Sequence, residues 1–234
     1  PDYKTRYIPT VAAATEVRLM LDRTIREIKK YSNKNIKIAF DEWNTYVEAT
    51  PPYFIENYNI ADAIYAASLL NACINRGDII TNTGIYHLIN VMGNYRIEKK
   101  KIWKTPTTLV LELYTKFHKG KILKSVVNSS NFVSFKLGKQ PEYKNNKLID
   151  SAVTMNGKYM CMSVVNKSSS EKILLKVPYL DRIAENYCIE GSNKVDLNTY
   201  ANTSKVKIKK NSLKTSKGFL ILPPHSISVV LFNI

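Results

Sequence analysis

Apolar residues recur at helical spacing through the first half of the chain and at about every second position through the second half. Near the start, apolar side chains follow one another at steps of four, four and three residues, which places them on one face of a helix. This pattern predicts a helix over about Val11–Tyr31 whose apolar stripe consists of Val17, Leu21, Ile25 and Ile28.

Two short segments rich in Ile lie between helical segments and predict strands, one at 36–41 and one at 78–82. Between them, Ile60–Ile74 is dense in Ala and Leu and predicts a second helix. Arg76 and Gly77 stand where the basic last turn and the following glycine of a helix end are expected.

A third helix is predicted to begin at Thr105, as the capping residue, with Pro106 in the first turn, and to stop at Gly120. The resulting order is helix, strand, helix, strand, helix. Strands that alternate with helices in this way are typical of βα units and a parallel sheet.

After Gly120 the apolar period is two, and short strands separated by turn residues are predicted to the end of the chain. Their expected ranges are 126–128, 132–137, 148–155, 159–166, 173–177, 206–209, 219–222 and 227–232. The pair Asn156-Gly157 between two of them is a strong hairpin signal. We therefore expect an α/β domain over residues 1–120 and an antiparallel β-sandwich, jelly-roll-like, over 121–234.

The formal net charge of +16 raises the question of nucleic-acid binding. Most of the excess lies in the second half, where Lys205, Lys207 and Lys209 are spaced singly along a predicted strand. This spacing favours a solvated sheet face, so we expect no nucleic-acid partner. No apolar run approaches the ~18 residues that a membrane span requires, and we expect no membrane partner.

The cysteines are three in number and have no metal-ligand spacing, which favours buried free thiols over disulfides or a zinc site. A reducing compartment follows from this interpretation, and we expect a cytoplasmic location. The first residue is Pro1 and no leader-like pattern follows it, so a signal peptide upstream of the visible chain stays an open alternative.

Candidate chemistry is concentrated in Asp41, Glu42, Trp43 and Asn44, where the first predicted strand ends. Catalytic groups of parallel α/β folds lie at this end of the strands. Because successive side chains of an extended strand point to opposite sides, we expect only one of the two acids to face a substrate. Trp43 and Tyr46 would offer aromatic faces to sugar rings; a capping Asp, a solvated Glu and a packing Trp are the structural alternative.

The segment 38–44, Ile-Ala-Phe-Asp-Glu-Trp-Asn, resembles the strand-seven signature of the α-L-arabinofuranosidases of glycoside hydrolase family 51. Further landmarks follow in the family's order: Ala61-Asp62-Ala63, Leu69-Leu70-Asn71, Asp78, 87–91, Asn198-Thr199 and 222–226. The resemblance covers essentially the whole chain. It implies the last two strands and helices of a (β/α)8 TIM barrel over 1–120, followed by the family's C-terminal β-sandwich.

The resemblance also implies a retaining glycosidase that removes terminal arabinofuranosyl units from arabinose-containing glycans. Glu42 falls on the family's nucleophile, and Trp43, Asn44, Tyr46 and His87 fall on substrate-binding positions. The sequence departs from the family at two of these positions, since the family commonly has Trp where Tyr46 stands and Gln where His87 stands. No metal or organic cofactor is implied.

The family's acid/base is a Glu preceded by Asn, and the chain contains no Asn-Glu pair. Retaining glycosidases require two carboxylates ~5–5.5 Å apart, so the second would come from outside this chain. We expect a partner, either the missing N-terminal half of the barrel or a second copy of the chain. Two alternatives stay open: another (β/α)8 glycosidase of different specificity, and a non-catalytic carbohydrate-binding sandwich fragment.

Overall fold

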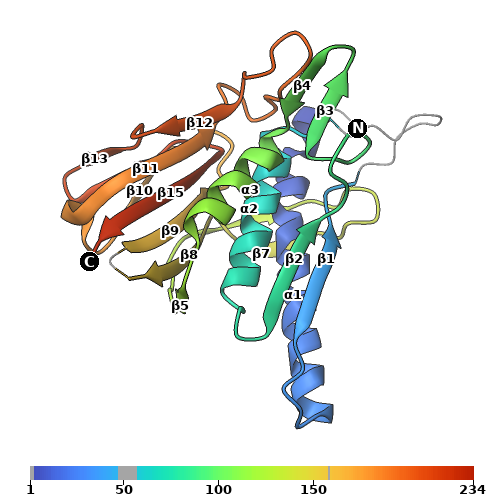
Figure 1. Ribbon diagram of the computed structural model, residues 1–234, viewed down its shortest axis with the longest axis vertical. Helices are drawn as coiled ribbons and strands as arrows, with labels where there is room; N and C mark the ends of the chain where they lie inside the picture. Colours follow the sequence, from blue (N-terminus) through green and yellow to red (C-terminus); the bar gives the residue numbers. More distant parts are fainter. Residues whose placement is uncertain (1–2, 47–56, 158) are drawn as a thin grey trace.

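A computed structural model describes residues 3–46, 57–157 and 159–234. The chain forms four layers: a pair of parallel strands, a layer of helices, a six-stranded antiparallel sheet and a three-stranded sheet (Figure 1). The helices are α1 (Tyr3–Tyr31), α2 (Ile60–Ile74) and α3 (Pro106–Phe117), with one 3₁₀ turn at Leu180–Arg182. No helix in the described ranges is long and apolar enough to cross a membrane.

The strands of the first half are β1 (Ile38–Trp43), β2 (Ile80–Ile85), β3 (Tyr95–Glu98) and β4 (Lys101–Lys104). Those of the second half are β5 (Lys121–Leu123), β6 (Asn131–Ser134), β7 (Tyr143–Lys147), β8 (Ile149–Asn156), β9 (Tyr159–Asn166), β10 (Ile173–Leu175), β11 (Ile183–Glu190), β12 (Lys207–Lys210), β13 (Lys214–Ser216), β14 (Phe219–Leu222) and β15 (Ser226–Asn233). The six-stranded sheet has the order β12-β11-β15-β9-β8-β5, and the three-stranded sheet has the order β10-β14-β13.

Helix α1 carries the predicted apolar stripe but begins eight residues earlier than expected, with Pro9 inside it. Leu21 is buried, and Tyr7 and Val11, both fully buried, continue the stripe towards the N-terminus. An internal proline costs a helix about 3 kcal/mol. Burial of the early apolar side chains outweighs this cost, which the sequence pattern alone did not indicate.

Helix α2 has the predicted bounds and is buried along almost its whole length, because it lies between the parallel strands and the six-stranded sheet. Gly77 follows the helix end as expected, but it does not have the left-handed backbone common for such a glycine, and Asn75 caps the helix in the right-handed region. A Cβ at Gly77 would lie 2.4 Å from Cδ1 of Ile122, the far end of a side chain that can move aside. Arg76 donates to the carbonyl of Ala72 at 2.8 Å, as expected of a basic residue at a helix end.

Helix α3 begins as predicted, with the Thr105 side chain capping the backbone N–H of Thr108 and Pro106 in the first turn. After the helix, Gly120 has φ 78. A Cβ at this glycine would lie 2.3 Å from the carbonyl oxygen of Met155, so only glycine lets the chain pass β8 and enter β5.

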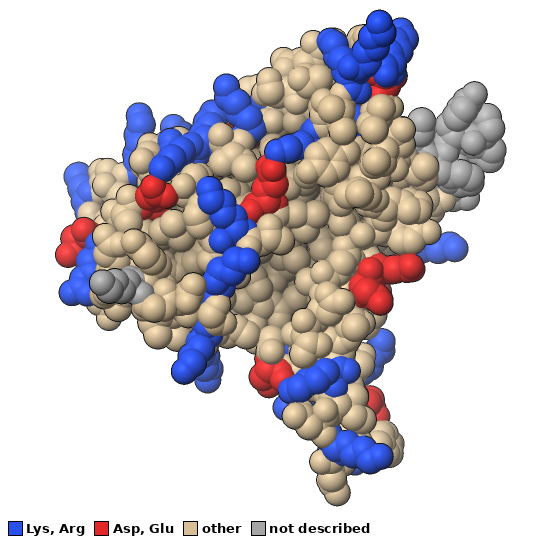
Figure 2. Space-filling model, in the orientation of Figure 1, with Lys and Arg blue, Asp and Glu red and all other residues tan. Residues whose placement is uncertain are grey.

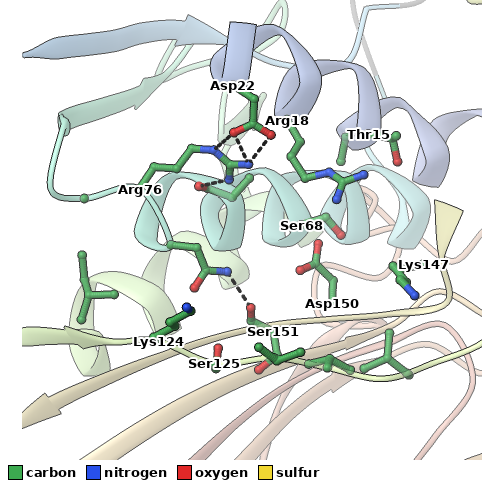
Figure 3. A pocket seen from close by; sticks show the side chains of 18 of the residues that line it. Thr15, Arg18, Asp22, Ser68, Arg76, Lys124, Ser125, Lys147, Asp150 and Ser151 are labelled. Carbon is green, nitrogen blue, oxygen red and sulfur yellow. Dashed lines mark hydrogen bonds and ion pairs between the residues drawn. The ribbon is translucent and has the colours of Figure 1, made fainter. Parts of the chain in front are cut away.

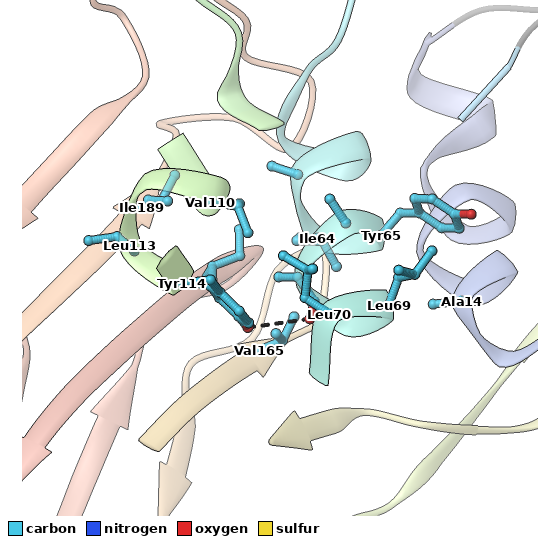
Figure 4. Close-up of a cluster of buried hydrophobic side chains, with 14 of the residues drawn as sticks. Ala14, Ile64, Tyr65, Leu69, Leu70, Val110, Leu113, Tyr114, Val165 and Ile189 are labelled. Carbon is cyan, nitrogen blue, oxygen red and sulfur yellow. Dashed lines mark hydrogen bonds between the residues drawn. The ribbon is translucent and has the colours of Figure 1, made fainter. Parts of the chain in front are cut away.

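The six-stranded sheet is buried on both faces. On β9, Cys161 and Val165 pack against the helices, whereas Met162 and Val164 pack against the three-stranded sheet. Met162 and Val164 thus belong to a core that lies between two antiparallel sheets, which is the arrangement of a β-sandwich. The helix-side core, part of which is shown in Figure 4, joins residues from before and after position 120.

A polar junction ties the helices to this sheet. Oδ1 of Asn71 on α2 accepts hydrogen bonds from the Tyr114 hydroxyl at 2.8 Å and from the Ser163 hydroxyl at 2.6 Å. A second link uses Asn198, whose side chain bonds to the carbonyl of Lys104 at 2.9 Å and to the backbone of Val206. Both asparagines belong to the landmarks that carry the family resemblance.

Several strands differ from the predicted pattern. The segment 126–128 forms no strand, and Val126 is 86% exposed. Strand β11 has no counterpart among the predicted strands, because its buried residues face both cores and show no clean alternation. The hairpin β3–β4 lies in a segment for which no strand was predicted. The expected hairpin at Asn156-Gly157 joins β8 and β9, with Gly157 at φ 59.

The three cysteines are free and buried, as predicted. Lysines of the second half are spread along the sheet edge, and several pair with acids on β11: Lys209 with Glu190 and Lys210 with Glu185, both at 2.6 Å. Figure 2 shows Lys and Arg dispersed over the visible face with acidic side chains among them.

Candidate active site

The two parallel strands end at the same edge of their sheet. Strand β1 pairs with β2 from Ile38 opposite Ile80 to Trp43 opposite Ile85. Just beyond, the backbone N–H of Tyr86 donates to the carbonyl of Trp43 at 3.1 Å. The loops that follow both strands therefore leave from one place.

A β-bulge interrupts this pairing at the two acidic residues. Phe40 pairs with Thr83 and Trp43 with Ile85, so three residue steps on β1 oppose two on β2. Phe40 packs against the helix-side core and Trp43 lies within it, while Asp41 and Glu42 between them are both exposed. Exposure alone does not say which of the two acids faces a substrate, so the expectation that only one of them does stays a prediction. It assumed a regular strand, whereas the extra residue of a bulge re-aims its neighbours.

Gly84 lies opposite the bulge. A Cβ at this position would lie 3.2 Å from the carbonyl oxygen of Asp41, closer than most side-chain contacts allow. The glycine therefore lets the bulged backbone of β1 approach β2. No sequence signal on β1 itself pointed to the bulge, but a lone Gly in a strand such as β2 commonly marks one.

Trp43 is 4% exposed and its indole N–H donates to the Thr83 hydroxyl at 2.6 Å. The expectation that its ring faces a sugar therefore does not hold for this conformation. The packing alternative fits instead: the buried ring fixes the end of β1 and thereby the orientation of Glu42 beside it.

Asn44 joins the two loops. Its side-chain N–H donates to the carbonyl of Met92 at 2.9 Å, and its oxygen accepts from the backbone N–H of Thr45 at 2.9 Å. The partner loop, 86–94, is tightly wound, with positive φ at His87, Asn90 and Val91. Asn44 thus holds a strained loop against the end of β1, and its predicted role in substrate binding stays a prediction.

A buried carboxylate holds the Thr45 side chain in place. Its hydroxyl donates to Asp62 Oδ1 at 2.8 Å, and Asp62 Oδ2 accepts from the backbone N–H of Asn59 at 2.8 Å and lies 3.3 Å from the Arg6 guanidinium. Burial raises the pKa of Asp62, and Arg6 and these hydrogen bonds oppose that effect. Sequence reasoning gave Asp62 no role beyond a landmark, although Asn59 and Asp62 form a capping box before an apolar run, which is a readable signal.

Tyr46 and His87 are both exposed at this edge. The His87 ring lies against Tyr86, with ring centroids 3.9 Å apart, so two aromatic rings follow β2. Tyr86 was not among the predicted site residues. The structure places Glu42, Tyr46 and His87 on loops or strand ends of one edge.

The other glutamates of the first half do not join Glu42 in the described residues. Glu112 pairs with Lys104 on the hairpin side of α3, and Glu98 ends β3. Glu48 and Glu56 lie outside the described residues.

Two further histidines lie elsewhere. His118 caps α3, at a helix end where a cation would complement the helix dipole. Burial lowers the pKa of His118 to about 4, so the ring is neutral near pH 7 and does not supply that charge. His225 is buried between the carbonyls of Ser169 and Gly191, at 3.2 and 3.1 Å.

Comparison with known proteins shows which family this chain matches. Residues 41–226 match the α-L-arabinofuranosidase C-terminal domain. A curated relative, the intracellular exo-α-(1→5)-L-arabinofuranosidase of Streptomyces lividans, is 25% identical over 193 residues, which cover 75% of this chain and 28% of that protein.

Solved structures share the fold. The α-L-arabinofuranosidase of Thermotoga maritima, solved with arabinose, has a TM-score of 0.84 at 23% identity, covering 100% of this chain and 50% of its own. The family 51 enzyme of Thermotoga petrophila RKU-1 has a TM-score of 0.83 at 23% identity, with the same coverage. That of Xanthomonas axonopodis pv. citri has 0.82 at 17% identity, covering 98% of this chain and 48% of its own.

The chain thus spans about half the length of these solved relatives and 28% of the curated one. The landmarks read from the sequence run from Ile38 to Ser226 and include the whole matched stretch, 41–226. The chain therefore belongs to the α-L-arabinofuranosidase C-terminal domain family, as its resemblance to the family 51 enzymes predicted.

Proposed function

We propose that this chain carries the nucleophile of a retaining α-L-arabinofuranosidase, with Glu42 attacking the anomeric carbon of a terminal arabinofuranosyl unit. The observation that carries the proposal is the bulge in β1, which leaves Glu42 exposed at the carboxyl edge of two parallel strands. Attack would form a covalent glycosyl-enzyme, and water would then release the sugar with retained configuration.

In this proposal β1 and β2 are the last two strands of a (β/α)8 barrel, and the remaining strands lie in a partner segment. The outward face of the pair supports this assignment, because Ala39, Asp41 and Glu42 are exposed on β1 and both strands have an unpaired edge. The acid/base carboxylate would come from that partner, which is either the N-terminal half of the barrel or a second copy. The curated relative is named intracellular, which supports a cytoplasmic location.

Tyr46 and His87 would line the substrate subsite, since both are exposed beside Glu42's strand end. Asn44 and Thr45 would position the loop between them through Met92 and Asp62. These assignments can be tested separately from the nucleophile. Substitution of any of these residues leaves the reacting carboxylate in place and should change substrate affinity.

The test uses an aryl α-L-arabinofuranoside, whose activated leaving group needs little acid catalysis. The chain is assayed alone and after mixing with the N-terminal half of the barrel, as Glu42→Gln, and as Glu98→Gln, a matched change at an exposed glutamate. We expect turnover in the mixture, its loss in Glu42→Gln, and no change in Glu98→Gln.

Absence of turnover in a mixture that forms a complex, or turnover indifferent to Glu42→Gln, would refute the proposal. Cleavage of aryl xylosides or glucosides in place of the arabinofuranoside would favour the alternative of another barrel glycosidase. Binding of arabinose-containing glycans without any turnover would favour the non-catalytic sandwich.

A further inference from the structure

A cavity of about 770 Å³ lies between α1, the end of α2 and the strands β5 and β8 (Figure 3). Its wall includes Gly77 and Asp78, which precede β2, whereas the candidate active site follows β2. The cavity is therefore at the opposite end of the parallel strands from Glu42. Its size is within the range of small-molecule sites, about 300–1,000 Å³.

The wall is polar and rich in cations. Arg76 is paired with Asp22 at 2.7 Å, and Lys167 lies 3.5 Å from Asp150. Arg18 also lines the cavity and is half-buried, but it has no hydrogen bond or ion pair in the described part of the chain. Lys124 and Lys147 stand at the rim, so positive charge exceeds negative charge around the space.

Lys167 is a buried cation beside this space. Its side chain is 5% exposed, and burial lowers its pKa; Asp150 opposes this effect, and the positive charge of Arg18 adds to it. Two cations, one deeply buried, thus face one carboxylate. A second negative charge would relieve the repulsion between them.

The Ser68 hydroxyl provides a second, independent observation. Ser68 is 1% exposed, lines the cavity, and its Oγ has no hydrogen-bond partner among the described residues. Figure 3 shows it directed into the space between the side chains of Arg18 and Asp150. Buried polar groups are normally paired, so an unpaired hydroxyl that faces a cavity indicates a bound group that accepts its hydrogen bond.

We propose that this cavity binds the phosphate group of a small molecule, with Arg18 and Ser68 as donors and Lys167 as a buried counter-charge. A guanidinium matches phosphate oxygens with two parallel hydrogen bonds. No aromatic residue lines the cavity, so the stacking surface that sugar rings use is absent from its described wall. The ligand is free phosphate or a small phosphate monoester.

The experiment is calorimetric titration of the 234-residue chain with inorganic phosphate and, separately, with glycerol 3-phosphate, at constant ionic strength with chloride as the blank. We expect binding in the millimolar range or tighter for at least one of them. Tighter binding of the monoester would identify an esterified phosphate as the ligand, and the reverse would identify the free ion.

Arg18→Gln should raise the dissociation constant about tenfold or more, the loss of a charge-assisted hydrogen bond. Ser68→Ala should raise it several-fold without destabilising the unliganded chain, because its hydroxyl has no partner to lose. Arg23→Gln removes the same charge from an exposed position of α1 and should change nothing. Absence of binding to both ligands, or equal weakening by Arg18→Gln and Arg23→Gln, would overturn the proposal.

Discussion

His118 makes the stability of the fold depend on pH in a way that can be isolated. Its ring lies at the end of α3, with Nδ1 3.1 Å from the Thr154 hydroxyl and Nε2 buried without a hydrogen-bond partner among the described residues. Burial lowers its pKa from 6.5 to about 4. The folded chain therefore holds the ring neutral at pH values where the unfolded chain protonates it.

The direction in which the free energy of unfolding changes with pH follows from proton uptake. Between pH 6.5 and about 4 the unfolded state binds more protons, so the contribution of His118 is complete above pH 6.5 and falls as the pH drops towards 4. A tenfold change in proton affinity corresponds to about 1.4 kcal/mol, which gives a contribution of about 3 kcal/mol across this window.

The assay is urea unfolding, followed by circular dichroism, at pH 7.5, 6, 5 and about 4. We expect the free energy of unfolding of the wild type to fall more steeply with acid than that of His118→Gln, which cannot titrate. The same substitution at the exposed His87 is the matched control. If His118→Gln and the wild type lose stability in parallel, the ring is not neutral in the fold and the reasoning fails.

Three further predictions concern stability and positioning. Asn71→Ala should lower the free energy of unfolding by about 2–4 kcal/mol, because two buried hydroxyls lose their shared acceptor, whereas Tyr114→Phe should cost about 1 kcal/mol; equal losses would contradict the shared junction. Gly120→Ala should cost more than 2 kcal/mol by thermal unfolding, about twice the effect of Gly157→Ala, whose left-handed backbone has open space. Thr45→Val should lower kcat/KM of the assembled enzyme several-fold while Thr45→Ser retains it; unchanged kinetics in Thr45→Val would exclude a positioning role.

Helix α2 and strands β9 and β14 have their expected bounds. Strand β9 was predicted although both of its faces are buried, because it is a continuous apolar run that follows the Asn156-Gly157 turn. Strand β11 was not predicted, because Glu185 and Asn186 interrupt its apolar run and it shows no period-two alternation. The family landmarks succeeded for another reason: Asn71 and Asn198 are polar junctions whose residue type is fixed by specific partners.

The candidate site was predicted in position but not in local geometry. The acids were found from their place at a strand end, and the pairing that brings β1 beside β2 followed from the βα pattern. The bulge was not predicted, because it depends on the register between β1 and β2 and its sequence signal, Gly84, lies on β2 and not on β1. Burial of Trp43 depends on the same bulge, because the extra residue of β1 moves the Trp43 ring to the core face.

The double burial of the six-stranded sheet limits how this chain can be divided. Position 121 lies where the helical pattern ends, yet a fragment starting there would expose Cys161, Val165, Ile227 and Val229 to water on an entire sheet face. Such a fragment would aggregate or recruit another helical layer. The helices and the sandwich therefore have to be kept together. Neither can be exchanged between related proteins without the surface that packs against it.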